Sequence, residues 1–207
     1  MKFALIGHPV AGSLSPRLIA AGYGGAHSYD LLDFEHFEDA WKAFTEGYDG
    51  INVTAPFKQD AFRKVNALSR EARETGLRFR RALVVGTGGA ARAAAYAARQ
   101  LGCEVTVAGR SLEKASALSY EAISLEEAGS LAPDVLLYTL PGSAPVPNGL
   151  PFKDAVVIEA EYRIPRLTDI PCRLYVSGRR WMLGQAVAGY RIFTGAEPNL
   201  EKMLEVL

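Results

Sequence analysis

Several features that would indicate particular classes of protein are scarce in this sequence. Its 207 residues include only two cysteines, Cys103 and Cys172, which lie far apart and match neither metal-ligand spacing nor a CxxC pattern. We therefore expect buried, reduced thiols, with no metal site and no disulfide framework. No apolar run reaches the ~18 residues that a membrane span needs. The first ten residues, interrupted by His8 and Pro9, do not resemble a signal peptide, which predicts a soluble, cytoplasmic protein.

The chain also lacks an excess of charge of either sign. Lys and Arg number 23, as do Asp and Glu, so no field attracts nucleic acid or an anionic membrane. Hydrophobic residues make up 49% and charged residues 22%, which excludes an intrinsically disordered chain. We expect a globular monomer or homodimer, of one large or two small domains, whose partner is a small molecule.

Short apolar runs rich in β-branched residues alternate with helical stretches along the chain. This alternation is typical of parallel α/β sheets. The charged, helix-like residues 68–81 break the pattern, and a helix ending at Gly76 is predicted at this domain boundary. Residues 140–150, rich in Pro and Gly, are predicted to form a loop. The predicted strands are residues 3–6, 29–32, 51–53, 83–85, 105–107, 135–138, 156–158 and 174–176.

The strongest motif is a glycine-rich turn, GTGGAA, which begins at Gly86. A predicted strand precedes it, and an alanine-rich helix over residues 93–101 follows it. Gly86 permits the tight turn, Gly88 lets the backbone approach a pyrophosphate, and the small Ala91 permits close packing of helix on strand. The N–H groups of the helix N-terminus favour an anion. The motif predicts dinucleotide binding, with a purely structural turn as the alternative.

The second strand of this predicted unit ends at Gly109, Arg110 and Ser111. A protein specific for NAD usually carries Asp or Glu here, which binds the ribose 2′-hydroxyl. The guanidinium of Arg110 instead suits a 2′-phosphate, and Lys114 lies one helical turn further on. We therefore expect NADP rather than NAD, with solvated surface cations as the alternative.

Five short parts of the chain, in order, resemble the shikimate dehydrogenase family. They are similar to its N-terminal substrate motif, its Asn-Val-Thr-x-Pro-x-Lys segment, its glycine loop with an Asn-Arg-Thr motif, its tyrosine-containing segment near the nicotinamide, and its C-terminal stretch with a substrate-binding glutamine. In this chain they are GHP at 7–9 with SLSP at 13–16, NVTAPFK at 52–58, GTGGAA at 86–91 with GRS at 109–111, YRIP at 162–165 with Thr168, and Gly178 with MLGQA at 182–186.

The resemblance implies a role for each matching residue. Lys58 would be the catalytic acid or base, and a lysine desolvated in a cleft suits this role because burial lowers its pKa. The alternatives are an exposed lysine at Lys58, helix-capping serines, and a core glutamine at Gln185. The implied substrate-binding residues are Ser13, Ser15, Asn52, Thr54, Tyr162 and Gln185. The implied cofactor-binding residues are Gly86, Gly88, Gly89, Ala90, Arg110, Ser111, Lys114 and Gly178.

The chain departs from the family between Lys58 and Gly86. The family has there an Ala-Val-Asn-Thr motif, a strand pair, an Asn-Thr-Asp motif and an interdomain helix, and none of these is present. The aspartate that partners the family's lysine therefore has no counterpart, and Asp60 is predicted to point to another helix face. Tyr138 also begins YTLP where the family has Asn-Ala-Thr, and Ala160 replaces a common methionine. A natural deletion, a binding protein without catalysis and a chain from which a segment was removed all fit.

We predict a two-domain α/β protein with the site in the cleft between the domains. Residues 1–76, completed by the C-terminal helix at 179–207, would form a substrate-binding domain, and residues 77–178 a Rossmann-like NADP-binding domain. The implied activity is NADP-dependent interconversion of 3-dehydroshikimate and shikimate, in the biosynthesis of chorismate and aromatic amino acids. The alternatives are a non-catalytic protein that binds NADP or a shikimate-like ligand, and a quinate/shikimate dehydrogenase.

Overall fold

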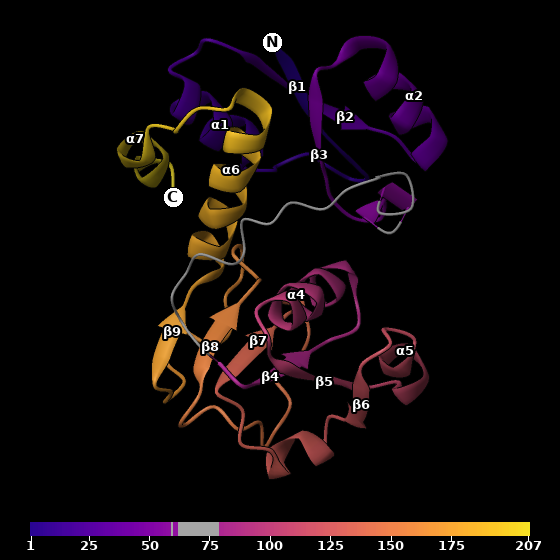
Figure 1. Cartoon of the computed structure of the whole chain (residues 1–207), viewed down its shortest axis with the longest axis vertical. Helices are drawn as coiled ribbons and strands as arrows, with labels where there is room; N and C mark the ends of the chain where they lie inside the picture. Colours follow the sequence, from indigo (N-terminus) through magenta and orange to yellow (C-terminus); the bar gives the residue numbers. More distant parts are fainter. Residues whose placement is uncertain (59, 62–78) are drawn as a thin grey trace. The chain divides into compact units, whose positions relative to one another are not determined.

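The structure of the chain is a computed structural model that describes residues 1–58, 60–61 and 79–207. The predicted helix ending at Gly76 lies outside the described residues. The chain divides into two compact units, each with its own parallel sheet (Figure 1). Unit 1 comprises Met1–Leu68 and Leu183–Leu207, and unit 2 comprises Ser69–Met182.

Unit 1 is built on a three-stranded parallel sheet with the strand order β2-β1-β3. Its elements are β1 (Lys2–Gly7), α1 (Ser15–Tyr23), β2 (Ser28–Asp33), α2 (Phe37–Gly47), β3 (Gly50–Val53), most of α6 (Gly178–Thr194) and α7 (Leu200–Glu205). Strand β1 lies between the other two, so its sequence is almost entirely apolar. Phe3 packs against Ile19 of α1 and Tyr190 of α6, and Ile6 packs against Ala40 of α2. Helices thus cover both faces of this sheet.

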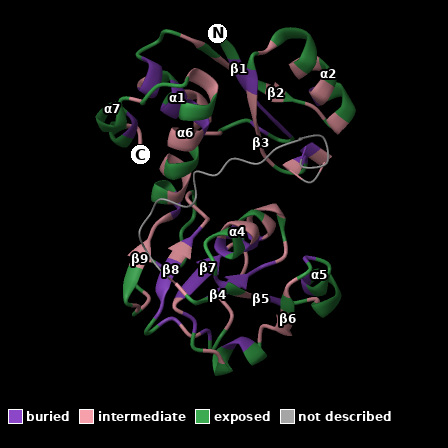
Figure 2. Ribbon diagram, viewed as in Figure 1, coloured by how far each residue is buried: buried purple, intermediate pink, exposed green. Residues whose placement is uncertain are grey.

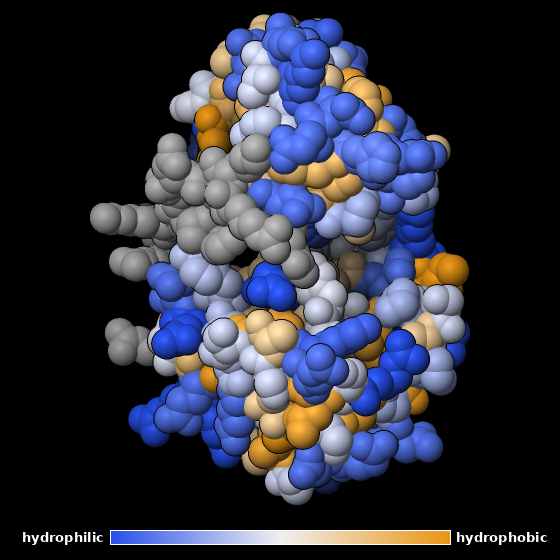
Figure 3. All heavy atoms as spheres, turned by 90° about the vertical axis from the view of Figure 1, so that its right-hand side faces the viewer, coloured by the Kyte–Doolittle hydropathy of each residue, from blue (hydrophilic) through white to orange (hydrophobic). Residues whose placement is uncertain are grey.

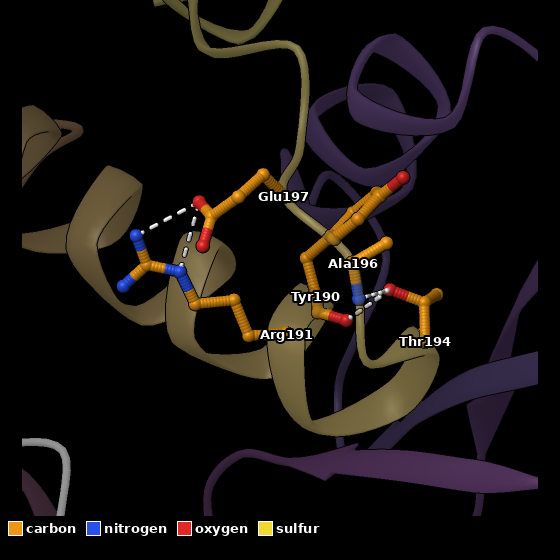
Figure 4. Close-up of polar contacts among 5 residues, drawn as sticks. All are labelled: Tyr190, Arg191, Thr194, Ala196 and Glu197. Carbon is orange, nitrogen blue, oxygen red and sulfur yellow. Dashed lines mark hydrogen bonds and ion pairs between the residues drawn. The ribbon is translucent and has the colours of Figure 1, made fainter.

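Hydrogen bonds order the turn that follows α6 (Figure 4). The Thr194 hydroxyl donates to the carbonyl of Tyr190 at 2.8 Å and accepts from the amide of Ala196 at 3.1 Å. Arg191 donates from Nε and Nη2 to one oxygen of Glu197, at 3.1 and 2.9 Å. Because Arg191 and Glu197 are exposed, their ion pair contributes little to stability, and the bonds of Thr194 carry more of the order.

Unit 2 is built on a six-stranded parallel sheet with the strand order β6-β5-β4-β7-β8-β9. The order along the sheet reverses between β4 and β7, as in doubly wound dinucleotide-binding folds, whose ligands bind beyond the carboxyl ends of the strands at this point. The elements are β4 (Arg81–Val85), α4 (Gly89–Gln100), β5 (Glu104–Gly109), α5 (Leu112–Ser116), β6 (Glu121–Ser124), the 3-10 helix η2 (Glu127–Ser130), β7 (Val135–Tyr138), β8 (Val156–Glu159) and β9 (Leu174–Val176).

The core of unit 2 lies on both faces of its sheet, whose central strands are buried (Figure 2). Helix α4 covers one face with small side chains, including Ala91 and Ala95, which pack against Val84 of β4. Alanine favours the helix intrinsically and lets it approach the strands closely. On the other face, Leu83 and Leu136 belong to a second apolar cluster.

The predicted α/β class and all eight predicted strands are confirmed. Six of the strands are longer than predicted by one to three residues, and α4 begins at Gly89 rather than at residue 93. Strand β6 was not predicted, because EAIS contains only a short apolar pair and lies at the edge of the sheet, where one neighbour suffices. The predicted loop at residues 140–150 contains no helix or strand.

Both cysteines are unpaired: Cys103 is buried, as expected, whereas Cys172 is only half-buried. Within the described ranges, no helix is long and apolar enough to cross a membrane. The same residues contain no group of three or more His, Cys, Asp and Glu arranged to hold a metal ion. On the face drawn in Figure 3, hydrophilic residues predominate and the hydrophobic ones form separate patches.

Candidate functional site

The serine loop of unit 1 brings Ser13 and Ser15 together between β1 and α1. The Ser13 hydroxyl donates to the Ser15 hydroxyl at 3.2 Å, and its oxygen accepts from the Ser15 amide at 3.2 Å. Helix α1 begins at Ser15, and its N-cap residue, Leu14, has no side-chain capping bond. The amide contact of Ser13 thus serves the start of α1, while both half-buried hydroxyls lie side by side. Paired hydroxyls of this kind are suitable donors to a carboxylate.

The end of β3 positions Asn52, Thr54 and Lys58. Asn52 lies in the strand, and the amide of Thr54 continues the pairing with β1 by donating to Ile6 at 2.9 Å. The side chain of Phe57, only 3% exposed, anchors the following turn in the core of unit 1. Lys58 comes next and is half-buried, and this burial lowers the pKa of its amine. Lys58 is therefore less basic than an ordinary lysine.

Close backbone contact joins the loops that follow β1 and β3. A Cβ atom on Gly7 would collide with Thr54 and would lie 2.8 Å from the carbonyl oxygen of Ala55. The amide of His8 donates to that same carbonyl at 3.0 Å. Gly7 therefore lets the loop that carries Ser13 lie against the loop that carries Thr54.

An acidic side chain of β2 holds the start of the serine loop. Asp33 lies 2.6 Å from His8 Nδ1 through one carboxylate oxygen and accepts from the Val10 amide at 3.1 Å through the other. The Val10 amide and then His8 lower the pKa of Asp33. Asp33 was not predicted as a site residue, because only the register of β1 against β2 places it beside His8.

The glycine-rich turn of unit 2 lies at the carboxyl end of β4. Gly86 has φ +119°, and a Cβ atom there would collide with the Thr139 hydroxyl, which itself donates to Val85 at 2.9 Å. Gly86 is thus required by both its backbone and its surroundings. Gly88, by contrast, is exposed, and nothing lies within 4 Å of the place where a Cβ would be. Gly89 and Ala90 follow this exposed glycine and form the start of α4.

The two predicted cations lie beyond the carboxyl end of β5. Arg110 and Lys114 are both exposed, and no acidic residue occupies the end of the strand. Between them, Ser111 caps α5 by accepting from the Lys114 amide at 3.3 Å. Gly109, where the family has asparagine, is buried, and a Cβ there would lie 2.7 Å from a methyl carbon of Thr87 in the glycine-rich turn.

These features of unit 2 fit a dinucleotide phosphate. The first turn of α4 has no acidic residue, and its N-cap, Gly88, has no side-chain capping bond. Its N–H groups therefore face no competing carboxylate there and are suited to an anion. Arg110 and Lys114 provide cations at the place where a ribose 2′-phosphate would require them.

Tyr162 lies on the loop between β8 and β9, residues 160–173, which we call the Tyr162 loop. This loop is in close contact with Gly178. A Cβ atom on Gly178 would collide with the backbone of Glu161 and lie 2.7 Å from the Tyr162 amide nitrogen. The Glu161 carboxylate accepts from the amides of Gly142 at 3.1 Å and Arg163 at 2.7 Å. Burial acts to raise the pKa of Glu161, but the backbone hydrogen bonds outweigh it and lower the pKa. Glu161 thus ties the Tyr162 loop to the Pro- and Gly-rich loop.

A second acidic side chain holds the far end of the Tyr162 loop. Glu159 is 0% exposed and accepts from the amide of Arg166 at 2.8 Å, the amide of Leu167 at 3.3 Å and the hydroxyl of Tyr175 at 2.5 Å. Burial and then this hydrogen bond raise the pKa of Tyr175. Sequence reasoning missed Glu159 because a single acidic residue after an apolar run looks like the exposed end of a strand.

Gln185 lies on α6 and is exposed, so it is not a buried core glutamine. Its amide is available to a ligand. Sequence reasoning missed Tyr29, whose hydroxyl donates to Asn52 Oδ1 at 2.7 Å. No motif contains Tyr29, and its only signal was its position in a predicted strand.

Comparison with known proteins gives relatives over the whole chain. Residues 5–77 match the family model described as the shikimate dehydrogenase substrate binding domain. The shikimate dehydrogenase (NADP(+)) of Natronomonas pharaonis is 31% identical, with 99% of this chain and 97% of that protein covered. The corresponding enzyme of Thermus thermophilus is 29% identical at 99% and 97% coverage.

Solved structures agree in fold. Shikimate 5-dehydrogenase from Thermus thermophilus, solved in complex with NADP(H) and shikimate, superposes with a TM-score of 0.80 at 26% identity, covering 100% of this chain and 98% of that one. The alignment with the Natronomonas protein spans 258 positions, whereas this chain has 207 residues. At least 51 of those positions therefore have no counterpart here, in agreement with the missing internal segment.

Proposed function

Because the chain belongs to the shikimate dehydrogenase family, we propose that it is a cytoplasmic NADP-dependent oxidoreductase that interconverts 3-dehydroshikimate and shikimate on the route to chorismate. Unit 1 binds the substrate, and unit 2 binds NADP. The observation that carries the proposal is Lys58, whose half-buried amine is less basic than usual and whose loop lies against the serine loop.

Unit 1 supplies the groups that hold the substrate. The hydroxyls of Ser13 and Ser15 donate to the substrate carboxylate. Asn52, Thr54 and Gln185 bind the ring hydroxyls, and the family resemblance also implies a substrate-binding role for Tyr162. Backbone contact between the two loops of unit 1 fixes the carboxylate-binding and proton-transfer groups relative to each other.

Lys58 carries the proton. In the oxidation of shikimate, its neutral amine accepts the proton of the reacting hydroxyl at Nζ, and in the reduction of 3-dehydroshikimate the ammonium returns it. NADP, when bound, supplies the hydride acceptor or donor. The turn at Gly86, Gly88, Gly89 and Ala90 would hold the pyrophosphate of NADP, and Gly178 lets the start of α6 lie against the Tyr162 loop.

A second candidate function is ligand binding without catalysis. It is favoured by the missing segment, which in the family carries the aspartate that partners the lysine. Among the described residues, no carboxylate forms an ion pair with Lys58, and burial alone shifts its pKa. Such a protein would bind NADP and a shikimate-like acid but would not catalyse a reaction between them.

Thermal-shift titrations with NADP, NAD, shikimate and quinate, run beside an assay of reduced-nicotinamide absorbance, separate these functions. We expect stabilisation by NADP and by shikimate, together with shikimate-dependent reduction of NADP. Stabilisation by both ligands without turnover would establish the second candidate. A chain that shikimate neither stabilises nor reacts with would contradict the proposed substrate.

Replacing Arg110 by alanine is expected to weaken NADP binding by about 10- to 100-fold and to leave NAD binding nearly unchanged. The reason is that a guanidinium bound to a 2′-phosphate contributes only where that phosphate exists. Calorimetric titration of both nucleotides measures the difference. Arg99→Ala is the control, since Arg99 lies in the last turn of α4, away from the glycine-rich turn. Equal weakening of both nucleotides by Arg110→Ala would refute the assignment.

A further inference from the structure

The hydroxyl of Tyr29, on β2, contacts Asn52 of β3, one of the proposed substrate-binding residues. Tyr29 lies opposite Phe3 on one side of β1, and Asn52 lies opposite Leu5 on the other side. Phe3 and Leu5 are two residues apart, so Tyr29 and Asn52 share one face of the sheet. The phenol spans β1, and its hydroxyl donates to Asn52 Oδ1 at 2.7 Å.

The hydrogen bond of this hydroxyl orients the Asn52 amide. The Tyr29 hydroxyl donates its single proton, and of the two ends of the amide only Oδ1 can accept it. Burial raises the pKa of Tyr29 against the opposing effect of Ser15, so the phenol keeps this proton at neutral pH.

The other end of the Asn52 amide therefore consists of N–H donors. Asn52 Nδ2 lies 3.1 Å from the place where a Cβ on Gly189 of α6 would be, whereas Oδ1 lies 3.9 Å from it. A side chain at position 189 of α6 would crowd the Asn52 amide, and Gly189 avoids this contact. An amide without a fixed partner would have no preference between its two orientations.

We propose that Tyr29 is a positioning residue, which fixes the Asn52 amide so that it offers donors, not an acceptor, to the substrate. With the hydroxyls of Ser13 and Ser15, the amide completes a set of donors for a ligand rich in acceptor oxygens, such as a hydroxylated carboxylic acid. This inference rests on the proposed function, which makes shikimate the ligand. It adds a residue outside every motif of the chain.

A double-mutant cycle on shikimate binding tests the inference. Calorimetric titration would compare the wild type, Tyr29→Phe, Asn52→Ala and the double variant. We expect Tyr29→Phe alone to weaken shikimate binding by about fivefold to tenfold. In the Asn52→Ala background the same substitution should have no further effect, because Tyr29 acts through Asn52.

Tyr48→Phe is the matched control. The Tyr48 hydroxyl donates to Asp30 of β2 at 2.8 Å and does not contact Asn52. This variant should leave shikimate binding unchanged. All variants should bind NADP with wild-type affinity, a result that general destabilisation would not produce. Wild-type affinity of Tyr29→Phe for shikimate would overturn the inference but leave the proposed function standing. So would equal weakening of shikimate binding by this substitution in the wild-type and Asn52→Ala backgrounds. A wild-type chain that binds NADP but no shikimate would overturn the proposed function and this inference with it.

Discussion

Replacing Lys58 by methionine is expected to lower kcat for shikimate oxidation by about 10²- to 10⁴-fold, the range in which a positioned acid or base contributes. Methionine keeps most of the length and apolar stem of lysine but cannot accept a proton. Because Ser13, Ser15 and Asn52 are unchanged, shikimate should still bind. Steady-state kinetics and calorimetry on the same preparation separate the loss of turnover from any loss of binding.

Lys42→Met is the control for Lys58→Met, since Lys42 is exposed on α2, where it pairs with Glu46. The pH profile adds a readout specific for proton transfer. Burial lowers the pKa of Lys58, so the wild-type oxidation rate should rise with pH and level off below the ordinary pKa of lysine. The residual rate of Lys58→Met should lack this rise. Wild-type turnover in Lys58→Met would exclude the lysine as the catalytic group.

The missing aspartate changes how Lys58 must work. A carboxylate beside a lysine favours the ammonium and raises its pKa, whereas burial favours the neutral amine. Because no described carboxylate forms an ion pair with Lys58, burial acts unopposed. The amine is thus less basic than that of an ordinary lysine, but no described carboxylate is present to orient it. Its order must come instead from the turn anchored by Phe57 in the core of unit 1.

The architecture and the glycine-rich turn could be predicted because they depend on local pattern. Apolar runs of three or four residues identify strands wherever they lie in the sheet, and Gly86 needs a left-handed backbone that glycine adopts readily. Strand β6 was not predicted because only two of its four residues are apolar and its place depends on pairing with β5. Local sequence carries no information about such a partner.

The additional polar groups could not be predicted because distant contacts create them. Tyr29 becomes relevant through Asn52, 23 residues away in the chain, and only the register of three strands brings them together. Glu159 is buried only because the loop to Leu167 and the hydroxyl of Tyr175 close over its carboxyl group. In each case the residue type was visible, but its partner was not.

Replacing Glu159 by alanine is expected to lower the free energy of unfolding by about 3 to 5 kcal/mol. The carboxylate is fully buried, and its removal leaves the buried amide of Leu167, the amide of Arg166 and the half-buried hydroxyl of Tyr175 without their acceptor. Each buried donor without a partner costs roughly 1 to 3 kcal/mol. Denaturant unfolding, followed by a probe in unit 2, measures the change.

Glu161→Ala is the matched control for Glu159→Ala. Glu161 also accepts from backbone amides, those of Arg163 and Gly142, but it is only half-buried, so water can replace the carboxylate. We expect a cost of about 1 kcal/mol for this variant. Equal costs for both variants would mean that the number of hydrogen bonds, rather than burial, sets the stability of the loop. A larger loss for Glu159 would establish its buried carboxyl group as the anchor that holds Tyr162 in place.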